Sequence, residues 1–133
     1  MRAAFADTHY FFAFANDHDA SHQKAVDFTR NFTGKLVTTE WVLTEVADGW
    51  CRGYWRSHFT TLWNEVRSNP NIHLVRFSAD LFEAGIELYI SRPDKEWSLT
   101  DCISFVVMQR EGLREALTGD RHFEQAGFIA LLK

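Results

Sequence analysis

Two acidic residues follow short apolar runs that are typical of buried strands. Asp7 closes the run at residues 3–6, and Asp120 follows the run at 115–118 after a single glycine. In an open parallel sheet the working crevice lies beyond the carboxyl ends of the strands, so both side chains are expected at that edge. Either aspartate alone could equally be a turn or helix-cap residue.

A third acid, Asp101, lies at the expected start of a helix. The segment Ser98-Leu99-Thr100-Asp101 fits a capping box, and capping alone would explain the carboxylate. The helix that follows is apolar nearly all round, however, which is typical of a helix buried against a sheet. We therefore expect Asp101 to share a face with Phe105 and Met108 and to point into protein or into a cleft.

A helical wheel separates Glu45 from the other acids of its helix. At about 100° per residue, Glu40, Thr44 and Asp48 fall on one polar stripe and are expected to be solvated. Glu45 falls on the apolar arc that also carries Val46, where a carboxylate is costly unless it is paired or binds a cation. The alternative is an edge position from which the side chain extends into water.

The chemistry of such a group of acids follows from their charge. Four carboxylates that converge without Lys or Arg between them repel one another and raise one another's pKa unless hard divalent cations neutralise them. Mg²⁺ or Mn²⁺ suits oxygen ligands and keeps waters for chemistry. With a phosphodiester substrate, one or two such metals activate a water and stabilise the leaving 3′ oxygen.

The elements that must position these acids alternate between strands and helices. Strands are predicted at 3–6, 35–38, 72–77, 115–118 and 128–132. Helices are predicted from residue 8, at 19–32, from about 40 to 50 or 51, and at 54–67, 81–90 and 98–110, with Asp19, Ser78 and Ser98 as N-caps. This alternation implies right-handed crossovers and an α/β fold: a three-layer α/β/α sandwich around a parallel sheet of about five strands.

Length and composition indicate a single domain over residues 1–133. Hydrophobic residues make up 46% of the chain and only 7 Gly and 2 Pro interrupt it, which excludes disordered and linker-rich proteins. The net charge of −4 argues against a passive nucleic-acid-binding surface, because such surfaces depend on clustered Lys and Arg. Any nucleic-acid contact is expected to rely on metal and on local cations, chiefly Arg52, Arg56, Arg92 and Arg121.

Localisation is predicted from what the chain lacks. No apolar stretch approaches the length of a membrane span, and no signal-peptide core is present, so no membrane association is expected. Cys51 and Cys102 fit neither a disulfide framework nor a four-ligand zinc site. A reducing cytoplasm is the predicted location.

Four blocks of the sequence resemble one protein family. They are Asp7-Thr8; Val37-Thr38-Thr39 followed by Trp41-Val42-Leu43-Thr44-Glu45; Trp97-Ser98-Leu99-Thr100-Asp101-Cys102-Ile103-Ser104-Phe105; and Leu117-Thr118-Gly119-Asp120-Arg121-His122-Phe123 with Gly127-Phe128. On these residues, which span nearly the whole chain, the protein resembles PIN-domain ribonucleases and, among them, the VapC-like toxins of toxin-antitoxin pairs.

The resemblance implies a function and a set of site residues. The function is metal-dependent hydrolysis of RNA phosphodiester bonds, with a cognate antitoxin protein as partner. The implied metal ligands and catalytic residues are Asp7, Glu45, Asp101 and Asp120, with Mg²⁺ or Mn²⁺ as cofactor. Thr8 and Thr118 match hydroxyl positions near the site.

A further segment interleaves basic and aromatic residues: Arg52, Tyr54, Trp55 and Arg56. Such groups stack on unpaired bases, and they equally suit a groove for an antitoxin peptide. Apolar, Trp-rich surface on a small acidic protein also suggests a symmetric homodimer.

Several other interpretations compete with this one. His18 and His22 have a zinc-like spacing, but with Asp19 as the cap His18 falls outside the helix. His122 is expected at the rim or as a substrate contact. A catalytically silent PIN-like scaffold is one alternative. A phosphoacceptor receiver module is another, although the third strand ends in Arg76-Phe77-Ser78 where that module needs an acceptor Asp.

Overall fold

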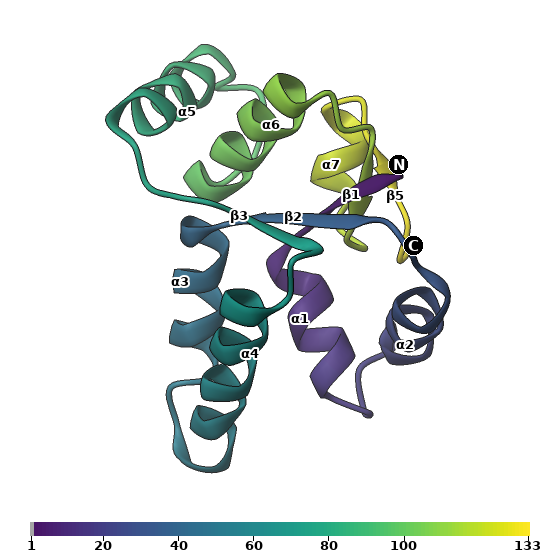
Figure 1. The fold of residues 1–133 in the computed structure, drawn as a ribbon. Coiled ribbons are helices and arrows are strands. Elements are labelled where there is room, and N and C mark those ends of the chain that lie inside the picture. The colour runs from purple at the N-terminus through teal and green to yellow at the C-terminus, as the bar shows by residue number, and fades with distance from the viewer. Residues whose placement is uncertain (1) are drawn as a thin grey trace.

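The central sheet is parallel throughout, as the sequence predicts. In the computed structural model, which describes residues 2–133, five strands lie in the order β3-β2-β1-β4-β5 (Figure 1). They are β1 (Ala3–Ala6), β2 (Lys35–Thr39), β3 (Ile72–Val75), β4 (Glu115–Leu117) and β5 (Ile129–Ala130). The carboxyl ends of β1 and β4, which precede Asp7 and Asp120, are therefore neighbours.

Within residues 2–133, seven α-helices cover the two faces of the sheet. They are α1 (Thr8–Ala15), α2 (His22–Asn31), α3 (Glu40–Gly49), α4 (Arg56–Ser68), α5 (Ala79–Ser91), α6 (Leu99–Glu111) and α7 (Arg121–Gln125), with one 3-10 turn at Gly53–Trp55. Figure 1 shows α1 to α4 on one side of the sheet and α5, α6 and α7 on the other. Right-handed crossovers require this, because the chain moves one way from β1 to β3 and the opposite way from β3 to β5. The three-layer α/β/α prediction is confirmed.

Helix α6 is the centre of one layer. Every residue from Cys102 to Met108 is buried, as its apolar circumference predicts. Phe105 packs edge-on against Phe123 of α7, with ring centroids 4.9 Å apart. Among residues 2–133, no helix has both the length and the apolar character that crossing a bilayer requires.

Some predicted boundaries were wrong. Helix α2 begins at His22 with Ser21 at the N-cap position; Asp19 Oδ1 instead accepts the Ser21 N–H over 2.8 Å within a turn. Strands β3 and β5 are shorter than predicted, because only the residues paired with β2 and β4 continue the ladder. Helix α7 was missed because five residues are too few to show a helical period.

Candidate active site

Asp7 and Asp120 meet through Thr118. Asp7 follows β1 directly and is only 6% exposed. Its Oδ2 accepts the hydroxyl of Thr118 over 3.0 Å, and the same hydroxyl oxygen accepts the Asp120 N–H over 3.1 Å. One side chain thus links the two strand-end acids, which are far apart in the sequence.

Asp101 caps α6 and also faces the site. Ser98 and Asp101 form the predicted capping box: the Asp101 N–H donates to Ser98 Oγ over 3.0 Å, and the Ser98 N–H donates to Asp101 Oδ2 over 3.2 Å. The same Oδ2 lies 3.2 Å from His122 Nδ1. The cap therefore leaves this carboxylate directed at α7, where Asp120 begins the helix.

Glu45 of α3 contacts the site through Thr8. The Thr8 hydroxyl donates to Glu45 Oε1 over 2.6 Å, which joins α3 to the first turn of α1. The expectation that Glu45 lies on a buried arc was wrong, because the residue is exposed while the adjacent Val46 is fully buried. Glu45 thus occupies the edge position that the sequence left open, and its charge is near enough to Asp7 to raise the pKa of that residue.

Glu40 is not the solvated residue that the wheel predicts. Its side chain is 17% exposed, its Oε1 accepts the Phe77 N–H over 2.6 Å, and its Oε2 pairs with Arg76 Nε at 3.1 Å. Thr44 and Asp48 on the same stripe are exposed, as expected. Glu40 holds the segment after β3 against α3, a contact that no wheel of a single helix can reveal.

The site's electrostatics show that the acids are close. Burial raises the pKa of Asp7 to about 7, with smaller contributions from the charge of Asp101 and then from that of Glu45. Hydrogen bonds from the Thr8 N–H and the Thr118 hydroxyl act in the opposite direction and lower this pKa. Burial raises the pKa of Asp101 as well, with the charge of Asp120 adding to it. Among residues 2–133, no ion pair joins a Lys or Arg to Asp7, Glu45, Asp101 or Asp120. Asp101 and Glu45 are thus near enough to raise the pKa of Asp7, and Asp120 is near enough to raise that of Asp101.

His122 is more central than the sequence indicated. Its Nδ1 lies 3.2 Å from Asp101 Oδ2 and 3.3 Å from Asp120 Oδ1, so the ring stands between two carboxylates. One ligand atom from each of these three residues lies within 4.8 Å of the other two. The sequence contained a signal for this position, because an N-cap at Asp120 places His122 in the first turn of the helix, beside the carboxylate.

The predicted binding segment lies apart from the acids. Arg52 and Tyr54 are exposed in the connection between α3 and α4, at the ends of these helices farthest from the sheet (Figure 1). Trp55 stacks on Trp50 with ring centroids 6.3 Å apart, and Arg56 donates to the Cys51 carbonyl over 3.0 Å. Trp55 therefore helps to fold the connection between α3 and α4. Arg52 and Tyr54 are exposed, although the Tyr54 ring also lies edge-on to Trp55 and His58.

The paired histidines do not form a zinc site. His18 is exposed, whereas His22 Nδ1 lies 2.8 Å from the Ala13 carbonyl and so holds α2 to α1. The sequence-based preference for a solvated helix start is confirmed for His18.

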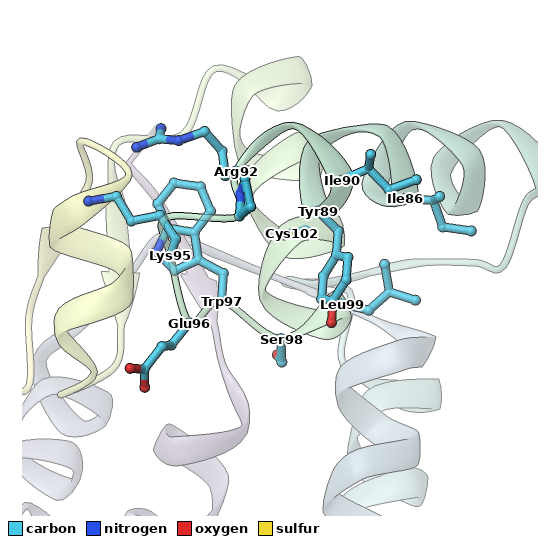
Figure 2. A pocket seen from close by; sticks show the side chains of 11 residues that line it. Ile86, Tyr89, Ile90, Arg92, Lys95, Glu96, Trp97, Ser98, Leu99 and Cys102 are labelled. Carbon is cyan, nitrogen blue, oxygen red and sulfur yellow. The ribbon is translucent and has the colours of Figure 1, made fainter.

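A cleft of about 960 Å³ borders the capping box. Figure 2 shows Trp97 beside Arg92 and Lys95, with Tyr89 and Ile90 projecting from α5 at the other side of the opening. Arg92 makes a two-pronged ion pair with Asp94, at 3.0 and 2.9 Å, and its guanidinium lies 5.1 Å from the Trp97 ring centroid. Asp94 thus offsets the charge of Arg92, one of the cations predicted to contact RNA.

Comparisons with known proteins identify the family. The model of the PIN domain family matches residues 4–129, so the chain belongs to that family. It is 28% identical over 137 aligned residues to the 23S rRNA-specific endonuclease VapC20 of Mycobacterium tuberculosis, covering 94% of this chain and 95% of that protein. The resemblance to PIN-domain ribonucleases and VapC-like toxins, and with it the prediction of a nuclease, is confirmed.

Solved structures agree on the fold. The crystal structure of M. tuberculosis VapC20, described as a sarcin-ricin loop cleaving toxin, superposes with a TM-score of 0.85 at 26% identity over 96% of this chain and 97% of that one. VapBC2 from Rickettsia felis, bound to a promoter DNA fragment, gives 0.67 at 15% identity with 97% of both chains covered. FitAcB from Neisseria gonorrhoeae gives 0.67 at 14% identity, covering 97% and 95%. The family assignment overturns the receiver-module alternative.

Proposed function

We propose that this protein is a divalent-metal-dependent endoribonuclease, the toxin of a toxin-antitoxin pair, and that it cleaves a structured loop of ribosomal RNA. The observation that carries the proposal is the convergence of Asp7, Glu45, Asp101 and Asp120 from four separate elements, without a Lys or Arg paired to any of them in residues 2–133. The endonuclease activity of the VapC20 relative supports the same chemistry. The complete set of acids argues against a silent scaffold.

The residues present fit a divalent cation. Carboxylate oxygens are the donors that Mg²⁺ and Mn²⁺ prefer. Burial and the neighbouring carboxylates raise the pKa values of Asp7 and Asp101, and a bound cation would relieve that cost of charge. When bound, such a cation supplies stabilisation of phosphate charge and lowers the pKa of the attacking water. Thr118 holds Asp7, and Thr8 holds Glu45, so both carboxylates are oriented before a ligand arrives.

The direct test is cleavage of a sarcin-ricin-loop oligonucleotide. Purified protein with Mn²⁺ or Mg²⁺ is expected to cut this RNA at one position, and EDTA is expected to abolish the cut. A control oligonucleotide of the same composition in scrambled order should stay intact. Single-site cleavage that persists in EDTA, with no metal bound, would contradict the mechanism. Cleavage of a different RNA alone would show that the proposed substrate is wrong.

The choice between the two metals depends on His122. An imidazole beside Asp101 and Asp120 adds a nitrogen donor, and nitrogen donors favour Mn²⁺ over Mg²⁺. We therefore expect Mn²⁺ to bind about 10-fold tighter than Mg²⁺, a difference of about 1.4 kcal/mol. His122→Asn is expected to remove most of that difference in titration calorimetry, while His73→Asn, a histidine paired only with Glu111, leaves it unchanged. Equal preference in wild type and His122→Asn would place the imidazole outside the metal site.

An apolar groove suits the antitoxin. A cavity of about 630 Å³ lies between α1, α2 and α4, and Tyr10, Phe14, Leu62 and Ile72 line it. An apolar antitoxin segment that fills this cavity would bury the exposed parts of these side chains. Arg52 and Tyr54, in the connection between α3 and α4, extend the proposed antitoxin surface.

We also propose that the protein is cytoplasmic and forms a homodimer.

Phe14→Glu tests that groove. Phe14 is 43% exposed, so the substitution should leave folding and RNA cleavage intact while a charge in the groove weakens antitoxin binding by about 100-fold, the effect of an interface hot spot. The measurement is affinity for the antitoxin encoded beside this gene, with growth after co-expression as a second readout. Ile129→Glu, at an apolar position on β5 that is 52% exposed, is the control. Similar affinities for both variants would place the antitoxin elsewhere.

A further inference from the structure

His9 joins the start of α1 to the loop that carries Asp120. The Gly119 N–H donates to His9 Nδ1 over 2.7 Å, although the two residues are 110 positions apart. Because Nδ1 accepts this bond, the ring proton lies on Nε2, the nitrogen 3.9 Å from Asp19 Oδ1. The side chain is 31% exposed. The imidazole is thus used as an acceptor for backbone, beside the acids but outside their cluster.

The loop held by His9 is short and decides where two site residues stand. Thr118, Gly119 and Asp120 connect β4 with α7. Their N–H groups donate to the Ala116 carbonyl over 3.0 Å, to His9 Nδ1, and to Thr118 Oγ1 over 3.1 Å. Asp120 then begins α7 by accepting the His122 N–H over 2.9 Å. A movement of this loop therefore carries Asp120 and His122 together.

The contact also explains the glycine at position 119. A Cβ there would lie 2.6 Å from His9 Cε1, closer than non-bonded carbon atoms approach, and 3.0 Å from His9 Nδ1, a tight contact. The loop can come this near to the imidazole only without a side chain. The contact between His9 and Gly119 therefore requires both an acceptor at position 9 and a residue without a side chain at position 119.

We propose that His9 is a positioning residue for this reaction: by accepting the Gly119 N–H it sets the place of Asp120 and His122 relative to Asp7. This inference rests on the proposed ribonuclease function. Without the acceptor, a partly buried N–H is left unpaired, which favours a shifted loop. A shift of about 1 Å in catalytic groups is enough to lower a rate by about 100-fold.

Substituting His9 by Asn or by Leu, two side chains of nearly the same shape, separates the effect of losing the hydrogen-bond acceptor from the effect of losing side-chain volume. Asn places an oxygen where His9 has Nδ1, whereas Leu places a methyl group there. His9→Leu is expected to lower kcat by about 10- to 100-fold with KM changed less than about threefold, and to weaken Mn²⁺ binding about 10-fold. His9→Asn should stay within about threefold of wild type in both. His18→Leu, on an exposed histidine, is the control.

A second pair of variants keeps the test independent of His9→Leu folding. Gly119→Ala alone collides with the imidazole, but in a His9→Ala background the added methyl group has room. The double variant should therefore lose less activity and less Mn²⁺ affinity than the product of the two single losses. Multiplicative losses, or equal behaviour of His9→Leu and His9→Asn, would overturn the proposal.

Amide hydrogen exchange of the metal-free protein separates this proposal from the proposed function. The Gly119 amide should exchange at least about 10-fold faster in His9→Leu than in wild type and near the wild-type rate in His9→Asn. If the wild type cuts no RNA while exchange and Mn²⁺ affinity change as stated, the ribonuclease function fails and the structural role of His9 stands. Unchanged Gly119 exchange in His9→Leu overturns the role of His9 whatever the protein cleaves.

Discussion

Asp7→Asn and Asp101→Asn are each expected to lower RNA cleavage by about 1,000-fold or more. Loss of one charged ligand removes several kcal/mol of transition-state stabilisation, and about 1.4 kcal/mol corresponds to tenfold in rate. Both substitutions keep the shape of the side chain, and an amide oxygen at position 7 can still accept the Thr118 hydroxyl. The rate measured with saturating Mn²⁺, beside a circular-dichroism spectrum, checks activity and fold together.

Asp48→Asn is the matched control for this experiment. Asp48 lies on α3 as Glu45 does, but on the exposed stripe that also carries Thr44 and without a contact to the other acids, so its substitution should change the rate by less than about twofold. Glu40→Gln is a poorer control, because it breaks the ion pair with Arg76 and is expected to cost up to about 1 kcal/mol of stability. An inactive Asp48→Asn together with an active Glu45→Gln would show that the wrong face of α3 has been assigned.

Asp7→Asn is also expected to stabilise the metal-free protein at about pH 8. The pKa of Asp7 is raised from 3.8 to about 7 in the folded protein, chiefly by burial. The folded state thus binds this proton more tightly than the unfolded state does. Its contribution to stability is complete below about pH 4 and is lost as the pH rises through 7. At about 1.4 kcal/mol per pKa unit, roughly three units correspond to a loss of up to about 4 kcal/mol.

Thermal melts in EDTA at several pH values between about 5 and 8 measure this loss. The midpoint of Asp7→Asn should exceed that of wild type by roughly 10 °C at pH 8, and the gap should shrink towards pH 5. Added Mn²⁺ should close the gap by stabilising only the wild type, because a ligand stabilises the state that binds it. Asp48→Asn should follow wild type at every pH. A destabilised Asp7→Asn at pH 8 would mean that the carboxylate is needed for folding rather than for metal.

The fold and three of the four acids were predictable from local sequence. Apolar runs followed directly by Asp7 and Asp120 place those residues at strand ends, and the capping box places Asp101 at a helix start. These patterns span a few residues, so hydrogen bonding and burial within one element are enough to specify them. The order of alternation then specifies a parallel sheet, because right-handed crossovers leave few other arrangements.

What the tertiary structure alone decided is how these elements meet. The sequence by itself could not show that Glu45 is exposed and accepts a hydrogen bond from the Thr8 hydroxyl. Nor could it show that Glu40 accepts the Phe77 N–H. Each depends on how α3 packs against segments elsewhere in the chain. The bonds from Gly119 to His9 and from Thr118 to Asp7 join residues more than a hundred positions apart. They exist because β1 and β4 are paired side by side, and no local periodicity records which strands will pair.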